Sequence, residues 1–388
     1  MVYDFDTPIN RRNTGSLKWD VEENELPLWV ADMDFQTAPA VREAIEERAR
    51  HGVFGYSIVT LDWYRAYASW WERRHGLKVE EEELIFCTGV VPAISSMVRK
   101  LTTPNENVLI CTPVYNIFFN SIINNGRRVL ECPLRYENGE YDVDFGDLEK
   151  KLSDPQTTLM ILCNPHNPVG KIWDDDTLSK IGELCQKYGV VVISDEIHCD
   201  LTAPGREYVP FSSVSDACRF NSVTCVAPTK AFNLAGLQSA AVIVPNKFLR
   251  HKVWRALNTD EVAEPNDFAI SATVAAFDRG EDWLEALRRY LYENRLEAER
   301  FFAEKLPMMR LIKAEATYLL WVDCSAVTSD SEKFASFIRR ETGLYICEGA
   351  EYGEAGRTFL RINAACPRET LLRGLELLAV GTEKYMKR

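Results

Sequence analysis

The chain has 388 residues, of which 46% are hydrophobic and 27% charged, and this composition is typical of a globular protein with a large core. Its length predicts roughly two to three domains. The net charge of −13, with arginines scattered along the sequence, disfavours nucleic acid or an anionic membrane as a partner, because both are attracted to concentrated basic patches.

The first 45 residues are rich in Arg, Asn, Asp and Trp, and we expect them to pack beside the C-terminal part of the chain. From residue 46 to residue 282, strands and helices alternate, which is typical of a mainly parallel sheet covered on both faces. The predicted strands are Leu84–Cys87, Val108–Cys111, Arg128–Cys132, Thr158–Cys163, Val190–Ser194, Ser222–Val226 and Ala240–Val244.

Helices are predicted between these strands. One spans Val114–Asn125 and is closed by Gly126, and another begins at Asp174 and ends at Tyr188. After Pro265 the pattern becomes helical, with a break near Gly280 and a long amphipathic helix from about Asp282 to Lys305. Residues 283–388 then alternate again and predict a smaller α+β domain, with segments at Thr317–Val322, Phe334–Arg340 and Thr358–Ala364 and a last helix from Arg368.

The start of the sequence and its cysteines predict a cytoplasmic protein. No basic stretch followed by an apolar core opens the chain, and its longest apolar runs are too short to cross a membrane. The eleven cysteines form no Cys-x-x-Cys pair, and most lie in apolar segments. We therefore expect reduced thiols in the core rather than disulfides or a zinc site.

One lysine differs from the others in its surroundings. Lys230 lies in Val226–Leu237, a run with no other charged residue, so we expect its amine to be buried. Burial lowers the pKa of an amine and makes it a nucleophile toward aldehydes. Asp195 follows the strand-like run Val190–Ser194 and offers a carboxylate. Pyridoxal phosphate (PLP) requires both groups, an amine for its aldehyde and an acid for its ring nitrogen.

Two further segments follow predicted strands, at the sheet edge where parallel sheets hold ligands. Cys87–Pro92 has a glycine between strand and helix, so backbone amides could converge on a phosphate there, and Thr229 could add a hydroxyl group. Asn164–Gly170 contains two prolines and a glycine, and its asparagines could bind an oxygen of an aromatic ring. Each segment alone also suits an ordinary turn or helix cap, so the prediction depends on their combination.

In combination, four segments resemble the fold-type I PLP enzymes, the aspartate aminotransferase superfamily, over nearly the whole chain. They are Thr88-Gly89-Val90-Val91, Asn164–Gly170, Ser194-Asp195-Glu196-Ile197-His198 and Thr229-Lys230. Longer strings are similar to the cystathionine β-lyase branch called MalY/PatB, namely Trp29–Phe35, Gly55–Ser57, Thr112–Tyr115 and Ser194–His198. The resemblance implies an α/β fold with a mainly parallel seven-stranded sheet in the large domain and a smaller α+β domain formed by both chain ends.

The resemblance also implies roles for individual residues. The catalytic residues would be Lys230, which bonds the cofactor aldehyde, Asp195, which pairs with the ring nitrogen, and Tyr56. The implied cofactor-binding residues are Gly89, Val90, Val91, Tyr115, Asn167, Asp195, His198, Thr229 and Lys230. The substrate would contact Ala31, Asn167 and Arg361. Tyr56 would reach the phosphate from a second subunit, which implies a homodimer with shared active sites, and no metal is expected.

Arg361 lies in the mostly apolar run Phe359–Asn363, where a guanidinium needs a carboxylate. A structural salt bridge would satisfy it, and the resemblance implies an amino-acid substrate instead. Three positions depart from many aminotransferases, with His198 in place of tyrosine, Ala227 in place of serine and Gln238 in place of a phosphate-binding arginine. The first two fit the lyase branch, whereas the third leaves the set of phosphate ligands incomplete.

The implied activity is that of a PLP-dependent carbon–sulfur β-lyase. It would cleave L-cystathionine or related cysteine S-conjugates to a thiol, pyruvate and ammonia. A class I/II aminotransferase is the alternative enzyme, because Lys230 would remove the same Cα proton in both reactions. A PLP-binding regulatory protein is the second alternative, in which a surface helix such as the one from Asp282 to Lys305 would contact a partner.

Overall fold

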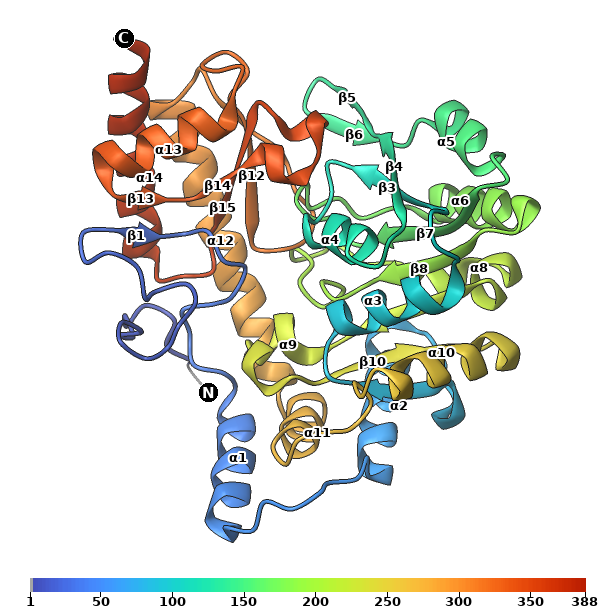
Figure 1. Cartoon of the computed structure of the whole chain (residues 1–388). Helices are drawn as coiled ribbons and strands as arrows, with labels where there is room; N and C mark the ends of the chain where they lie inside the picture. The colour runs from blue at the N-terminus through green and yellow to red at the C-terminus, as the bar shows by residue number, and fades with distance from the viewer. Residues whose placement is uncertain (1–2) are drawn as a thin grey trace.

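The computed structural model describes residues 3–388, and a seven-stranded sheet forms the centre of its larger part (Figure 1). The strand order is β2-β10-β9-β8-β7-β3-β4, and only β10 runs antiparallel to its neighbours among the described strands of this sheet. The strands are β2 (Leu84–Cys87), β3 (Asn107–Thr112), β4 (Arg128–Pro133), β7 (Thr157–Cys163), β8 (Val191–Asp195), β9 (Ser222–Val226) and β10 (Ala240–Ile243). The predicted mainly parallel seven-stranded sheet is therefore confirmed.

Both faces of this sheet are buried, which explains why its strands are almost continuously apolar. On β3, Val108 and Ile110 pack toward one core and Leu109 and Cys111 toward another, because successive side chains of a strand point to opposite faces. The first core lies against α3 (Val90–Leu101), α4 (Ile117–Ile123) and α10 (Lys247–Thr259). The second lies against α5 (Phe145–Leu152), α6 (Asp175–Tyr188), α7 (Phe211–Val214) and α8 (Asp216–Phe220).

A third core, rich in aromatic residues, joins helices from distant parts of the sequence. Trp63, Tyr67, Trp70 and Trp71 of α2 (Leu61–His75) are all fully buried. They pack in this core with residues of α1 (Pro39–His51), α11 (Ala269–Arg279) and the start of α12 (Glu281–Lys305). The helix predicted from Asp282 to Lys305 and the break at Gly280 are both confirmed.

The smaller part of the molecule contains a four-stranded antiparallel sheet in the order β11-β12-β15-β14. Its strands are β11 (Arg310–Leu311), β12 (Leu319–Asp323), β14 (Cys347–Glu348) and β15 (Phe359–Asn363). Their apolar side chains share a core with α12, α13 (Ser331–Thr342) and α14 (Arg368–Met386). A short hairpin, β5 (Arg135–Glu137) and β6 (Glu140–Asp142), stands apart from both sheets.

The N-terminal segment lies against this smaller part. Strand β1 (Leu26–Pro27) pairs in parallel with β13 (Leu344–Tyr345), and Arg339 donates to the carboxylate of Glu25 at 2.6 Å. Figure 1 shows the segment that carries β1 beside α13 and α14. The predicted domain limits at residues 45 and 282 remain predictions.

Two predicted elements begin later than expected. The helix predicted from Val114 begins at Ile117, because the Val114 amide donates to the Tyr352 carbonyl at 2.9 Å and ties the preceding residues to the smaller part. The strand predicted from Thr317 begins at Leu319, because Thr317 has a φ of 71°, which is left-handed and incompatible with a strand. Both shifts come from contacts or backbone angles that no local pattern encodes.

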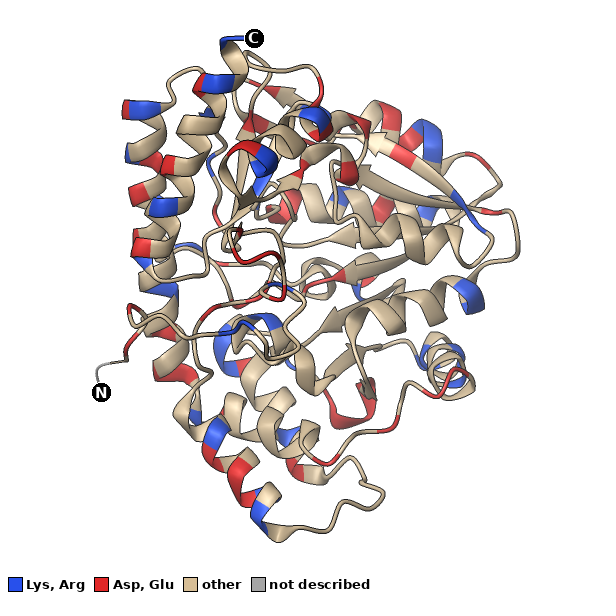
Figure 2. Ribbon diagram, turned by 60° about the vertical axis from the view of Figure 1, so that its left-hand side comes forward, with Lys and Arg blue, Asp and Glu red and all other residues tan. Residues whose placement is uncertain are grey.

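Charges of both signs are interspersed over the ribbon (Figure 2). All eleven cysteines are free and buried, which confirms the prediction of core thiols. Within residues 3–388, no helix combines the length and the apolar character that crossing a membrane requires.

Candidate active site

Lys230 lies in the short helix α9 (Pro228–Ala231), which directly follows the carboxyl end of β9. Its Nζ donates to the Ala31 carbonyl at 2.5 Å, and the Tyr318 hydroxyl donates to the same oxygen at 2.9 Å. Burial among protein atoms, and next the charge of Arg361, lower the pKa of this amine to about 8. About a tenth of the amine is therefore neutral at pH 7, and this form can act as a nucleophile or base.

The expectation that Lys230 is fully buried is only partly right. Its side chain is partly exposed, whereas Lys18 is the lysine with no exposed surface among residues 3–388. Lys18 contacts Asp34 at 2.8 Å and Asp32 at 3.7 Å. The sequence pattern missed this pair because Lys18 lies in a polar stretch and meets its carboxylates only through folding.

Asp195 is the last residue of β8 and is almost completely buried. Among the described residues, its carboxylate accepts one hydrogen bond, from the Ile197 amide at 3.1 Å, and forms no ion pair within 4 Å. Burial raises the pKa of this carboxyl to about 7, although the Ile197 amide and the charge of Lys230 oppose the rise. An acid in this condition would be satisfied by a group that carries a proton, such as a ring nitrogen.

The predicted turn after β7 lies beside Asp195, because the Asn164 amide donates to the Asp195 carbonyl at 2.9 Å. His166 fixes the turn from the other side through a 2.7 Å contact with the Pro113 carbonyl. Asn167 is buried, and the oxygen of its side-chain amide has no hydrogen-bond partner. A buried unpartnered oxygen is costly, so this atom is available to a ligand donor.

Arg361 is in the middle of β15 and only 5% exposed. One of its nitrogens, Nη2, donates to the Trp29 carbonyl at 2.9 Å, but Nε and Nη1 have no partner. The guanidinium lies over the Tyr352 ring at 4.9 Å. Because no carboxylate of the described residues pairs with it, the structural salt bridge considered above is absent there, and the free edge suits a carboxylate ligand.

Electrostatic effects place Tyr115 and His198 in the same group. Burial raises the pKa of Tyr115 to about 12, while the charge of Arg361 lowers it and that of Asp195 raises it. Burial, with the charges of Lys230 and Arg361, lowers the pKa of His198 to about 3, so its imidazole is neutral at physiological pH. Lys230, Asp195, Arg361, Tyr115 and His198, which come from distant parts of the sequence, thus act on one another electrostatically.

Gly89, Val90 and Val91 begin helix α3 at the carboxyl end of β2, on the edge of the sheet that carries Lys230. The first amides of a helix have no partner within the helix, and they suit an anion. A Cβ atom at Gly89 would come within 3.1 Å of the Pro92 ring, so the turn is tight enough to favour glycine. Thr229 precedes Lys230 and is 9% exposed.

Tyr56 does not join this group within the chain. It is fully exposed in an extended segment, where it lines a groove of about 590 Å³ together with Ser57 and Ile270. Its neighbours Val53, Phe54 and Ile58 are also exposed, which leaves a strip of apolar side chains in contact with solvent. The predicted role of Tyr56 therefore requires another chain.

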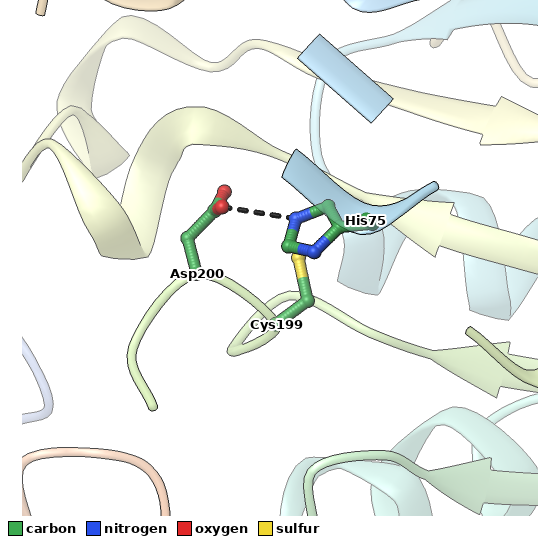
Figure 3. A group of neighbouring side chains, drawn as sticks. All are labelled: His75, Cys199 and Asp200. Carbon is green, nitrogen blue, oxygen red and sulfur yellow. Dashed lines mark hydrogen bonds and ion pairs between the residues drawn. The ribbon is translucent and has the colours of Figure 1, made fainter. Parts of the chain in front are cut away.

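A second cluster of titratable side chains includes the two residues that follow His198 in the sequence. His75, Cys199 and Asp200 lie side by side, with His75 Nε2 at 3.0 Å from Asp200 (Figure 3). Asp200 also accepts from Trp70 at 3.1 Å and from Arg74 at 3.3 Å. Burial alone would raise the pKa of Asp200, but these donors outweigh it and the pKa is lowered. The cluster therefore fastens α2 to the loop after β8, because the donors around Asp200 occupy the carboxylate.

Sequence reasoning missed the residues that hold segment 29–33 against the site. Asn363 donates to the carbonyls of Val30 and Asp32, and Asn233 donates to the carbonyl of Met33 at 2.9 Å. Tyr318 also holds this segment, because its hydroxyl donates to the Ala31 carbonyl. Asn363 lies two residues after Arg361 on β15, but nothing in the pattern distinguishes an amide that binds a backbone carbonyl from one that binds a ligand.

These features define a fold-type I transferase fold with a site at the carboxyl edge of its large sheet. The chain belongs to the aminotransferase class I and II family, whose profile matches residues 23–378.

Individual relatives resemble the chain over nearly its full length. Cystathionine beta-lyase PatB of Bacillus subtilis is 44% identical over 379 residues, covering 96% of this chain and 97% of the relative. Protein MalY of Escherichia coli is 33% identical, with 96% and 97% covered. The crystal structure of cystalysin from Treponema denticola, which contains a pyridoxal 5′-phosphate cofactor, superimposes with a TM-score of 0.96 at 33% identity, covering 99% of this chain and 100% of cystalysin.

Proposed function

We propose that the chain is a PLP-dependent carbon–sulfur β-lyase that cleaves L-cystathionine, or a related cysteine S-conjugate, to a thiol, pyruvate and ammonia. The observation that carries the proposal is that Lys230 and Asp195 lie at the carboxyl edge of the large sheet and that Arg361, from β15 of the smaller sheet, acts electrostatically on Lys230, while each of the three keeps an open bonding position. The similarity to PatB, MalY and cystalysin over nearly the whole chain supports the same conclusion.

The open positions fit PLP group by group. Lys230 would bond its aldehyde carbon, Asp195 would hold the proton of its ring nitrogen, and Asn167 would meet its ring hydroxyl. Val90 and Val91 would receive its phosphate at the start of α3, with Thr229 beside them. When bound, PLP supplies an electron sink for the charge left on the substrate carbon after proton removal.

Residues of the chain account for the remaining steps. Arg361 binds the substrate α-carboxylate through Nε and Nη1, which fixes the direction of the Cα–H bond. Lys230, with its pKa lowered to about 8, accepts the Cα proton. Loss of the thiolate from Cβ completes the elimination, and hydrolysis of the remaining fragment yields pyruvate and ammonia.

Pyruvate release without an acceptor tests this proposal against the aminotransferase alternative. The purified protein, loaded with PLP, is incubated with L-cystathionine in the absence of any keto acid, and pyruvate and free thiol are measured together. We expect equal amounts of both products over many turnovers. A reaction that needs a keto-acid acceptor and releases no thiol would contradict β-elimination and favour transamination.

We further propose a homodimer in which Tyr56 of one subunit completes the site of the other. The support is the full exposure of Tyr56 beside apolar neighbours, which a second copy would cover. Mixing two inactive variants, Tyr56→Ala and Lys230→Ala, after mild dissociation tests it. A mixed dimer has one site with both residues intact, so about a quarter of the activity should return. No recovery in verified mixed dimers would contradict shared sites.

The free, buried cysteines also fit a reducing compartment, and we place the protein in the cytoplasm. The regulatory alternative gains no support from its proposed helix. In α12, Trp283, Leu284, Leu287 and Leu291 face cores of the chain itself, which leaves no broad apolar face for a partner.

A further inference from the structure

Glu351 directly precedes Tyr352, whose ring packs on the proposed substrate arginine, and Glu348 lies three residues earlier in the chain. Glu351 belongs to a short 3₁₀ turn, η3 (Gly349–Tyr352), and its carboxylate accepts a hydrogen bond from Asn116 Nδ2 at 3.0 Å. Asn116 directly follows Tyr115, so this contact lies next to the predicted cofactor face. Besides burial, the nearby carboxyl of Glu348 raises the pKa of Glu351.

The turn that carries Glu351 is held against the site on two sides. The Tyr352 ring contacts the Arg361 guanidinium at 4.9 Å, and the Tyr352 carbonyl accepts the Val114 amide at 2.9 Å. Burial and the nearby Glu348 raise the pKa of Glu351 to about 7, whereas Arg361 lowers it. The charge of Arg361 therefore acts on Glu351, although no ion pair joins the two within 4 Å.

Within the described residues, Arg361, Glu348 and Glu351 form no ion pair with an oppositely charged side chain. Among residues 3–388, no lysine or arginine forms an ion pair with Glu348 or Glu351. Arg361 is 5% exposed with two unpartnered nitrogens, and Glu351 is exposed to solvent. A buried open cation next to an open anionic pair suits a ligand that carries a carboxylate and, further along its chain, an ammonium group.

We propose that Glu351 selects sulfur amino acids that carry a second amino group beyond the sulfur atom, by accepting a hydrogen bond from that distal ammonium. L-Cystathionine and L-cystine have such a group, whereas L-cysteine and S-methyl-L-cysteine do not. The inference rests on the proposed function, because Arg361 must hold the α-carboxylate for the far end of the substrate to reach Glu351. The distal ammonium would also relieve the repulsion between Glu351 and Glu348.

The test compares two substrates in one variant. Glu351→Gln keeps the shape of the side chain and removes its charge, and pyruvate release is followed with L-cystathionine and with S-methyl-L-cysteine. We expect kcat/KM for L-cystathionine to fall about tenfold, chiefly through KM, because a charge-assisted hydrogen bond is lost. The value for S-methyl-L-cysteine should stay within about twofold, because this substrate has no distal charge.

Glu354→Gln is the matched control. Glu354 follows on the same surface, is 80% exposed and pairs with Arg357 at 3.0 Å, so its loss should leave both substrates unaffected. Asn116→Ala is the second variant. It removes the amide that orients Glu351 and should lower the preference for L-cystathionine in the same direction.

The outcomes separate the two proposals. Equal losses on both substrates, or none in either variant, would overturn the role of Glu351 and leave the lyase function standing. A preference of the unchanged protein for S-methyl-L-cysteine over L-cystathionine would also overturn the role of Glu351. An unchanged protein that releases pyruvate from neither substrate would overturn the proposed function and this inference together.

Discussion

Two lysines of this chain occupy opposite kinds of site. Lys18, in the N-terminal segment, has no exposed surface, and Asp34 and Asp32 lie within ion-pair distance of its amine. Lys230, at the end of β9, is partly exposed and bonds only a backbone carbonyl, with Arg361 as the strongest charge acting on it. Pairing rather than exposure separates a structural cation from a reactive amine, because a partner carboxylate stabilises the charged form.

Replacing Lys230 tests the reactive side of this comparison and has the largest expected effect. In Lys230→Ala, pyruvate release from L-cystathionine should fall by about 10³-fold or more, because the group that moves the Cα proton is gone. The absorption band of bound PLP should change as well. Lys100→Ala, at an exposed position, serves as the control. Activity near that of the unchanged protein would remove Lys230 from the mechanism.

Replacing Lys18 tests the structural side. Lys18→Met should lower the free energy of unfolding by about 3 kcal/mol, because the buried Asp34 loses one of its two cations and keeps only Arg11, at 2.7 Å. Urea titration measures this change. Lys78→Met removes an exposed pair with Glu80 at 2.7 Å and should cost less than about 1 kcal/mol. Equal losses of unfolding free energy in the two variants would mean that burial of the ion pair around Lys18 does not affect stability.

Asp195, the acid proposed to hold the cofactor ring nitrogen, should have the opposite effect on the free energy of unfolding to Lys18. In the cofactor-free protein, burial raises the pKa of Asp195 to about 7, from 3.8 in an unstructured chain. The unfolded state therefore loses this proton first, and the folded state loses stability as pH rises between these values. Asp195→Asn should then be more stable than the unchanged protein by about 2 to 4 kcal/mol at pH 8.

This gain should shrink as the pH of the urea titration is lowered toward 5, since the carboxyl of the folded protein is then protonated. The same substitution should also slow β-elimination, by less than Lys230→Ala does. Glu304→Gln, at an exposed position on α12, should show neither effect. A variant that loses stability at pH 8 would contradict the view that Asp195 waits for a proton-bearing ligand.

Arg361 gives the smallest of the four effects. Arg361→Lys keeps a positive charge but loses the planar edge that binds a carboxylate through two nitrogens. We expect KM for L-cystathionine to rise by about 10- to 100-fold, with a smaller change in kcat. Arg357→Lys, on the neighbouring exposed turn, provides the comparison. An unchanged KM in Arg361→Lys would show that the substrate carboxylate binds elsewhere.

The strand pattern alone predicted the large sheet well, because all of its strands except the edge strand β4 are almost wholly buried. It also predicted which motifs lie at the carboxyl edge, and with them Lys230, Asp195 and Asn167. The pattern was weaker where distant segments meet. The start of α4 was misplaced because Val114 bonds Tyr352, which lies far along the sequence in the smaller part.

The adjacent acids Asp195 and Glu196 show the same difference between what the sequence predicts and what tertiary contacts decide. Asp195 and Glu196 are equally plausible in the sequence, yet Glu196 accepts hydrogen bonds from Ser194 at 2.7 Å and the Phe211 amide at 3.0 Å. Its carboxylate is thereby satisfied, and Asp195 alone keeps an open position. The sequence determined the elements and the chemistry they could carry, since both depend on local composition and order. Tertiary structure decided which charged groups are paired, as for Lys18, and which stay open, as for Lys230 and Arg361, because pairing depends on contacts between distant segments.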